Sequence, residues 1–418
     1  MFNTIRNAWK IPDLRYKMMF TLAMLTIFRL GSFIPVPGMD TEALSQLIQG
    51  GGLLGFFDTI SGGAFENFAI FAMSISPYIN ATIIMQLLTI AIPSLEALAK
   101  EGEEGRKKIA QFTRYGTVVL ALIQASALSY GLRGYLLRTD AASVILVALS
   151  LTAGTAFLMW LGEQINEKGI GNGISLLIFA GIISRLPGGI QKIIELYKVK
   201  TTNLLEIILF GVFALLIIMG VVLIQEGQRR IPVQYAKRVV GRKMYGGQST
   251  HIPLKVNQAG VIPVIFAMSL IAFPGQIAQF FPNSGAYRFF NTYFNWGTWG
   301  HGILYALLII GFTYFYTAVT FNPIEVSNNI KKYGGFIPGI RPGKPTSDFI
   351  AKSLNRITLV GAFFLAVIAI VPIFLMNFTG IKVYFGSTSL LIVVGVAMDF
   401  VKQIEAQMVM RNYQGFLK

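Results

Sequence analysis

Charged side chains are scarce in this sequence, and cysteine is absent. Only 13% of its 418 residues are charged, against roughly a quarter in soluble domains. In contrast, 54% are apolar, and the mean hydropathy is +0.61. A soluble chain of this length needs a charged surface to stay dispersed, so the composition predicts an integral membrane protein. The lack of cysteine excludes disulfides, thiolate metal sites and cysteine nucleophiles.

Groups that could catalyse a reaction are also few. The two histidines, His251 and His301, lie outside the apolar segments or at their edge. The sequence contains no HExxH, GxSxG or Walker motif, and the stretch GIGNG at residues 169–173 lacks the Lys and Ser/Thr of a phosphate loop. An intramembrane enzyme would need a catalytic group at depth, and none is found. We therefore predict that the protein is not an enzyme and uses no cofactor.

Acidic residues are nearly absent from the apolar segments. A transporter that couples to an ion or proton usually buries carboxylates in the membrane. Here Glu206 and Asp399 lie only near segment ends, and the basic Arg29 lies near the end of the first segment. This shortage disfavours a solute transporter, which stays as the second hypothesis.

Ten apolar segments are long enough to cross the roughly 30 Å of hydrocarbon in a bilayer. The predicted spans are residues 18–35, 67–92, 112–131, 142–162, 171–187, 204–224, 259–281, 302–321, 356–376 and 385–405. No small-x-small cleavage site follows the first of them, so we expect it to be retained as a span.

Positive charge gives the orientation of these spans. Most Lys and Arg residues fall in one alternating set of connecting segments, which the positive-inside rule places in the cytoplasm together with both termini. Ten spans divide into five and five, and an odd number per half forces the halves into opposite orientations, as in many transport folds. We predict an N-terminal half at residues 1–187 and a C-terminal half at residues 188–418.

Three connecting segments are unusual. The cytoplasmic segments 225–258 and 322–355 are long, basic and partly rich in Pro and Gly, which favours two projecting docking loops. The segment 49–65 on the other side is apolar and glycine-rich but too short to span. It is either an interfacial loop or a short helix folded back into the membrane, which is tolerated only within protein or a cavity.

Several motifs resemble the SecY family, the central subunits of bacterial protein-conducting channels. They occur in the family's order along the chain. The motifs are FRLGSFIPVPG at 28–38, SPYIN at 76–80 with QLL at 86–88, EGEEGRKK at 101–108, MWLGEQI at 159–165, GIGNGIS at 169–175, QSTHIPLKVN at 248–257, FIPGIRPG at 336–343 and TSLLI at 388–392.

The resemblance implies an all-α membrane protein of ten transmembrane helices in two inverted, pseudo-symmetric halves. A pore between the halves would carry unfolded secretory polypeptides, and a lateral gate would release membrane segments sideways. The gate would lie between the second and third spans on one side and the seventh and eighth on the other. The pore would be passive and driven by the motor ATPase SecA, by the ribosome or by the membrane potential.

The resemblance also assigns residues to roles. A central apolar ring falls on Ile75, Ile79, Ile174, Ile178, Ile265 and Ile392. A short plug helix at about residues 53–65 would close the resting channel, with Leu54, Phe56, Phe57, Ile60, Ser61, Gly62 and Gly63 in it. Docking residues on the two basic loops would be Arg341, Lys237, Arg238, Arg242 and Lys243. Taken alone, each of these isoleucines is ordinary packing within a span.

The implied partners are the small subunits SecE and SecG, the motor SecA, the ribosome, polypeptides that carry signal sequences and the lipid bilayer. The implied location is the bacterial plasma membrane, with many spans and both termini in the cytoplasm. A hydrophobic constriction suits the implied role, because it dewets and blocks ions when empty.

Overall fold

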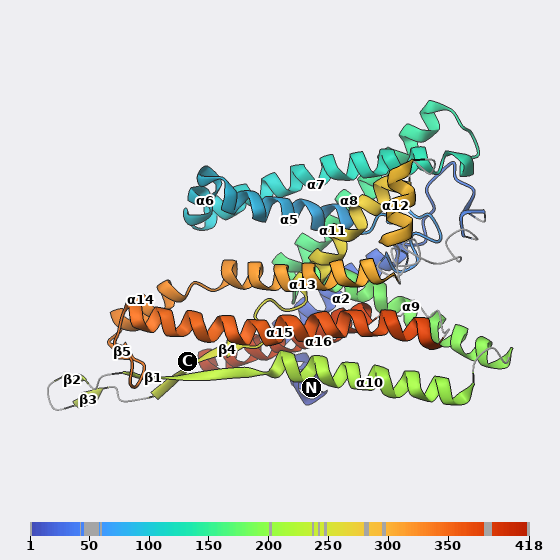
Figure 1. Cartoon of the computed structure of the whole chain (residues 1–418). Coiled ribbons are helices and arrows are strands. Elements are labelled where there is room, and N and C mark those ends of the chain that lie inside the picture. Colours follow the sequence, from blue (N-terminus) through green and yellow to red (C-terminus); the bar gives the residue numbers. More distant parts are fainter. Residues whose placement is uncertain are drawn as a thin grey trace.

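In the computed structural model of the chain, long helices run roughly side by side along one direction (Figure 1). The structure describes residues 2–41, 43–45, 58, 61–199, 203–235, 238–240, 243–245, 249–279, 284–294, 298–379 and 387–415.

Within these ranges, ten long helices correspond to the ten predicted spans. They are α2 (Pro12–Gly31), α5 (Ser76–Ala91), α7 (Glu103–Gly131), α8 (Ala141–Lys168), α9 (Gly173–Lys198), α10 (Leu204–Glu226), α11 (Ile262–Gln279), α13 (Trp299–Thr320), α15 (Lys344–Thr379) and α16 (Ser387–Gly415). Five of them are long and apolar enough on their own to cross a membrane, and the bent pair of α5 with α6 (Pro93–Lys100) makes a sixth. The predicted all-α polytopic architecture is confirmed.

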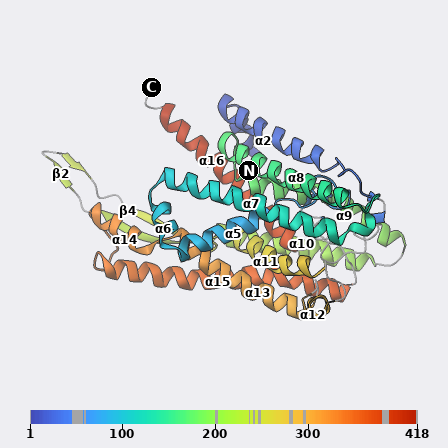
Figure 2. The ribbon, with the colours of Figure 1, turned by 90° about the horizontal axis from the view of Figure 1, so that it is seen from above.

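Helices from distant parts of the chain pack around a large apolar cluster. In Figure 1, α5, α7 and α8 lie together on one side, whereas α10, α13, α15 and α16 lie on the other; Figure 2 shows the same bundle from above. The largest cluster of buried side chains draws on both groups and includes Ile83, Leu177, Phe266 and Leu391. The outer helix α10 is only 11% buried over its apolar window, as expected for a helix that faces lipid.

The second span is shorter than predicted. The prediction began at residue 67, but the helix begins at Ser76, and residues 61–75 form a series of turns. Phe68 and Ser74 have φ angles of 39° and 52°, which a right-handed helix does not tolerate. The helix ends where Ile92 adopts an extended conformation before Pro93, and α6 leaves at an angle of 99°.

The fifth span is longer than predicted. Helix α9 begins after Asn172, whose side chain accepts a hydrogen bond from the Ser175 amide, and it continues to Lys198 with Pro187 inside it. Residue 187 is therefore not the end of an element. The division of the chain into two halves stays a prediction.

Short elements complete the described chain. They are the helices α1 (Phe2–Trp9), η1 (Arg133–Tyr135), α12 (Gly285–Tyr293) and α14 (Pro323–Lys332) and the strands β1 (Gln228–Tyr235), β2 (Arg238–Val240), β3 (Lys243–Tyr245), β4 (Ser249–Lys255) and β5 (Gly335–Phe336). Ala8, Leu14 and Ile404 share one buried cluster, so segments near both ends of the chain lie on the same side of the bundle.

The two segments predicted as docking loops are joined in the structure. Strand β1 pairs antiparallel with β4 along one edge and with β5 along the other, so that Ile231 faces Ile252 and Gln234 faces Phe336. The resulting sheet projects from one end of the bundle (Figure 1). Part of the predicted second loop is helical, because it contains α14 and the first turns of α15.

Candidate functional site

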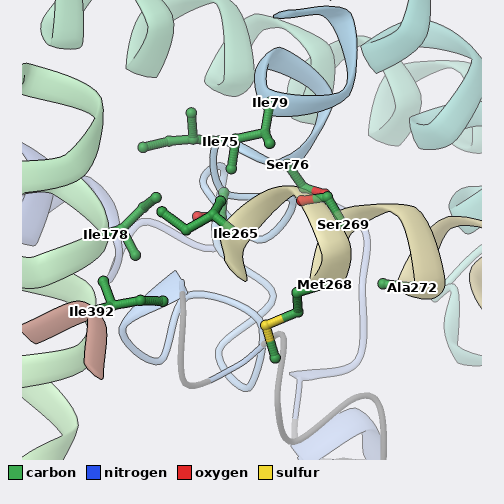
Figure 3. Close-up of a pocket in the computed structure, with 10 residues that line it drawn as sticks. Ile75, Ser76, Ile79, Ile178, Ile265, Met268, Ser269, Ala272 and Ile392 are labelled. Carbon is green, nitrogen blue, oxygen red and sulfur yellow. The ribbon is translucent and has the colours of Figure 1, made fainter. Parts of the chain in front are cut away.

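Five of the six predicted ring isoleucines line a single small cavity. They are Ile75 and Ile79 from the start of α5, Ile178 from α9, Ile265 from α11 and Ile392 from α16. Figure 3 shows their side chains pointing toward a common space from four helices. Water-sized spheres can occupy about 30 Å³ of this space, and one water needs roughly 10–15 Å³ on that measure. The constriction therefore holds a few waters at most and is closed to a polypeptide.

Local sequence places the isoleucines at helix starts. Ile75 precedes Pro77, which occupies the first turn of α5, and the Ile79 amide donates to the Ile75 carbonyl at 3.1 Å. Proline suits this position because its missing N–H would be unpaired there anyway. The two side chains are four residues apart and share one face of the helix.

The sixth predicted ring residue, Ile174, is not among the cavity's lining. Its Cδ1 lies over the backbone of Gly162 in α8, where a Cβ atom would come within 2.5 Å of it. The small glycine thus provides room for this side chain between α8 and α9.

A larger cavity of about 380 Å³ lies on the sheet side of the constriction. Ser175, one turn before Ile178 on α9, lines this cavity. So does Ile262, one turn before Ile265 on α11. Polar and charged residues contribute to its wall, namely Asn172, Ser175, Lys255, Asp399, Lys402 and Gln403. We call this wider space the polar cavity because of these residues, and it precedes the narrow constriction along the same helices.

A turn of chain is fixed to α9 on the opposite side of the constriction. We call Asp58 with residues 61–66 the Ser61 turn. The Gly62 carbonyl accepts hydrogen bonds from Arg29 of α2 and from Ser184 of α9, the second at 3.4 Å. The Arg185 guanidinium donates to Asp58 and, at 2.6 Å, to Glu66.

The order along α9 puts these features in line. Ser175 lines the polar cavity, Ile178 the constriction, and Arg185 holds the Ser61 turn. Ser175 and Arg185 are ten positions apart, which corresponds to about 15 Å along the helix at a rise of 1.5 Å per residue. Of the predicted plug residues, Ser61, Gly62 and Gly63 lie in this turn, whereas Leu54, Phe56, Phe57 and Ile60 are outside the described residues.

The predicted docking residue Arg341 is exposed on a well-supported connection. Its carbonyl accepts a hydrogen bond from the Thr346 hydroxyl at 2.9 Å, and the Gly343 carbonyl accepts one from the Ser327 hydroxyl of α14 at 2.7 Å. Arg238 and Lys243 lie in the small hairpin of β2 and β3, whereas Lys237 and Arg242 are outside the described residues.

Sequence reasoning missed that the two loops share a core. Alternate residues of β1, Ile231 and Val233, are buried with Leu254, Ile337 and Ile350 from the other loop elements. The signal was the alternation of apolar and polar residues in QRRIPVQY, which is typical of a half-buried strand. Within the described ranges, no group of three His, Asp or Glu residues could hold a metal ion.

A polar cavity, an apolar constriction and a tethered turn, in line through a bundle of apolar helices, define a membrane channel that is closed at its narrowest point. The model of the SecY family matches residues 69–401 of the chain. A protein translocase subunit SecY from Halalkalibacterium halodurans is 52% identical over 435 residues, with 100% of both chains covered. The corresponding subunit from Bacillus subtilis is 49% identical, also with 100% of both chains covered.

The chain therefore belongs to the SecY family. It is a multi-pass membrane protein and the channel subunit of a protein translocase, not an enzyme. This family was already indicated by the motifs in the sequence, and that identification is confirmed.

Solved structures share the fold at low sequence identity. One described as a protein conducting channel has a TM-score of 0.69 at 20% identity, with 97% of each chain covered. Another, described as a SecY protein whose plug domain stabilises the closed state and maintains a membrane seal, has a TM-score of 0.67 at 20% identity and 97% coverage of each chain. Sec61 in a canine ribosome-channel complex has a TM-score of 0.63 at 18% identity, again with 97% of each chain covered.

Proposed function

We propose that translocating polypeptides pass from the polar cavity through the isoleucine constriction and past the Ser61 turn. The observation that carries this proposal is the single cavity lined by isoleucines from α5, α9, α11 and α16, helices that come from both predicted halves of the chain. A site built between two bodies can widen when they move apart, whereas a cavity within one body cannot do so without unpacking it.

The constriction acts as a seal in the resting channel. A narrow passage walled by isoleucine loses its water, and ions cannot cross it without hydration. Aliphatic side chains also have several rotamers and no hydrogen-bonding groups, so they close around a moving chain without preferring one sequence. The Ser61 turn belongs to a plug that closes the channel on the far side, a role that is described for the plug domain of one structural neighbour.

Membrane segments leave sideways between α5 and α7 on one side and α11 and α13 on the other. The α5–α11 junction supports this proposal. Ser76 of α5 and Ser269 of α11 both line the cavity where these helices contact each other (Figure 3), and small side chains at a junction separate with less loss of packing than interlocked large ones.

The joined loops form the docking surface for the partners that drive transport. Arg341 and the basic hairpin that carries Arg238 and Lys243 project from the sheet end, which by the charge distribution is the cytoplasmic end. One structural neighbour is in complex with a ribosome, which supports the ribosome as a partner here. We propose SecA as the second driving partner, SecE and SecG as the companion subunits, and the bacterial plasma membrane as the location.

The test uses the absence of cysteine from the chain. A secretory precursor with a single cysteine is arrested in mid-transit in channels that carry either Ile79→Cys or Ile84→Cys. Ile79 is 7% exposed at the constriction, whereas Ile84 on the same helix is 45% exposed. We expect a disulfide with the precursor at position 79 and none at position 84. An engaged precursor that never cross-links to position 79 would contradict the proposed path.

A further inference from the structure

Four charged side chains meet where the Ser61 turn contacts the bundle. Arg29 comes from α2 and Arg185 from α9, whereas Asp58 and Glu66 belong to the turn itself. The side chains of Asp58, Glu66 and Arg185 are 10%, 25% and 30% exposed, so water screens them far less than it screens a surface ion pair. The cluster has no net charge.

Arg185 occupies the central position in this cluster. The same nitrogen, Nη2, donates to Asp58 Oδ2 and to Glu66 Oε2. The two carboxylates are also linked through the backbone, because the Glu66 amide donates to Asp58 Oδ1 at 2.7 Å. Without the guanidinium, two negative charges would remain close together in a partly buried site, and removal of one partner of a buried pair is the costly change.

The backbone of the turn makes room for the guanidinium. Gly63 has a φ angle of +91°, and a Cβ atom there would lie 2.9 Å from both Cζ and Nη2 of Arg185. The Gly63 amide donates to the Asp58 carbonyl at 2.9 Å. A side chain at position 63 would therefore displace Arg185 from the two carboxylates.

Arg29 makes a different kind of contact. Its Nη1 donates to the neutral carbonyl of Gly62 and, at 3.1 Å, to the Ser184 hydroxyl. Neither of these contacts is to a carboxylate. Arg29 and Arg185 therefore provide a matched comparison between two arginines that contact the same turn.

We propose that Arg185 positions the Ser61 turn in the closed channel by neutralising Asp58 and Glu66 together, so that its removal releases the turn through repulsion between the two carboxylates. This inference rests on the proposed role of the turn as part of the plug. It assigns the holding of the plug to one side chain of α9 and explains why an arginine lies on the side of the membrane with little positive charge.

The experiment measures how fast a cysteine in the turn is labelled. Ser61 is 0% exposed, so a Ser61→Cys channel in membranes, with its cellular partners present, should react slowly with a polar maleimide. We expect Arg185→Gln to raise this rate by roughly tenfold or more, the scale of losing hydrogen bonds to charged groups. Arg29→Gln should raise it less, and the distant, exposed Arg133→Gln should leave it unchanged.

The decisive variant removes the negative charges of Asp58 and Glu66 as well as the positive charge of Arg185. If repulsion releases the turn, then Asp58→Asn with Glu66→Gln should return the labelling rate of the Arg185→Gln channel most of the way to that of the parent. A rate that stays high in the triple variant, or that does not rise in Arg185→Gln, would overturn the proposal.

A second cysteine separates release of the turn from general unfolding. Ser129 of α7 is also 0% exposed but lies outside the cluster, so Ser129→Cys should stay slow to label in every variant. Labelling at both positions would mean that the variant has unfolded, which also counts against a positioning role. The labelling result does not depend on the precursor cross-link at position 79, so the plug assignment and the pore path can fail separately.

Discussion

Gly62 combines a left-handed backbone with a close approach to the backbone of a neighbouring helix. Its φ angle is +68°, and a Cβ atom there would lie 2.9 Å from the Cα of Gly181 in α9. Gly38 has a similar φ of +88°, but no atom lies within 4 Å of the position of its Cβ. Substitution of Gly38 tests backbone strain alone, whereas substitution of Gly62 tests strain together with close packing.

We expect Gly62→Ala to release the Ser61 turn and Gly38→Ala to leave it in place. Both changes incur about 1–2 kcal/mol of left-handed strain, but only the first also pushes the turn away from α9. The labelling rate of Ser61→Cys in the two backgrounds checks this prediction. Equal rates would show that strain alone, not the approach to Gly181, governs the position of the turn.

At the residue scale, much of the constriction could be predicted, but only through the family resemblance. Ile75 and Ile392 are apolar residues among many in their helices, and neither period nor composition distinguishes them. Arg185 was counted among the charges outside the cytoplasm, and its role could not be predicted because Asp58 and Glu66 lie more than a hundred residues away in sequence. Such contacts depend on how α9 meets the turn, which no local pattern encodes.

At the scale of elements, α8 packs closely against residues 61–75 next to the constriction, and this contact can be tested by mutation. Gly154 lies at this contact, and a Cβ atom there would come within 1.9 Å of the Ile70 carbonyl oxygen. Gly211 of α10 is its counterpart on an outer helix, where a Cβ would meet nothing within 4 Å.

We expect Gly154→Ala to lower the thermal stability of the channel, by about 1–3 kcal/mol for an overpacked contact. The added Cβ would collide with the Ile70 carbonyl oxygen, a backbone atom that cannot rotate away as a side chain can. Gly211→Ala should be neutral or stabilising, because alanine is favoured over glycine in a helix by up to about 1 kcal/mol. Thermal unfolding of the purified complex in detergent measures both, and a stable Gly154→Ala channel would contradict the packing.

The elements also show why apolar composition alone overestimated the second span. Residues 67–75 are nearly as apolar as the helix that follows, so a hydropathy window joins them. The structure uses them instead as turns buried against other helices, where Val36 donates a backbone hydrogen bond to Phe68 at 2.9 Å and Ile70 donates one to Ile34 at 3.0 Å. Non-helical backbone at membrane depth is tolerated because protein surrounds it.

At the scale of the whole molecule, the two long basic loops pack together as one body rather than two. Strand β5 brings the connection that carries Arg341 to the edge of β1, and Ile350 of α15 is buried in their shared core. Helix α15 continues from this core into the bundle. A partner that moves the loops can therefore also move α15. Two independent loops could not pass such a movement to the bundle in this way.

The stability of the closed channel should depend on pH through Asp58 of the Ser61 turn. Burial raises the pKa of the Asp58 carboxyl above its ordinary value, and the nearby Glu66 charge adds to the rise, whereas the Arg185 guanidinium opposes it. Once the Ser61 turn moves away, the pKa of Asp58 returns to about 3.9. The closed state then binds a proton more readily than the open one.

Acidification on the side that reaches Asp58 should therefore favour closure. As pH falls from neutral toward about 4, the closed state gains stability through the raised pKa of Asp58, and the gain ends below the ordinary value. We expect ion leak through the empty channel to decrease over this range and to become nearly independent of pH in Asp58→Asn. An increase in leak on acidification would contradict a raised pKa of Asp58 in the closed state.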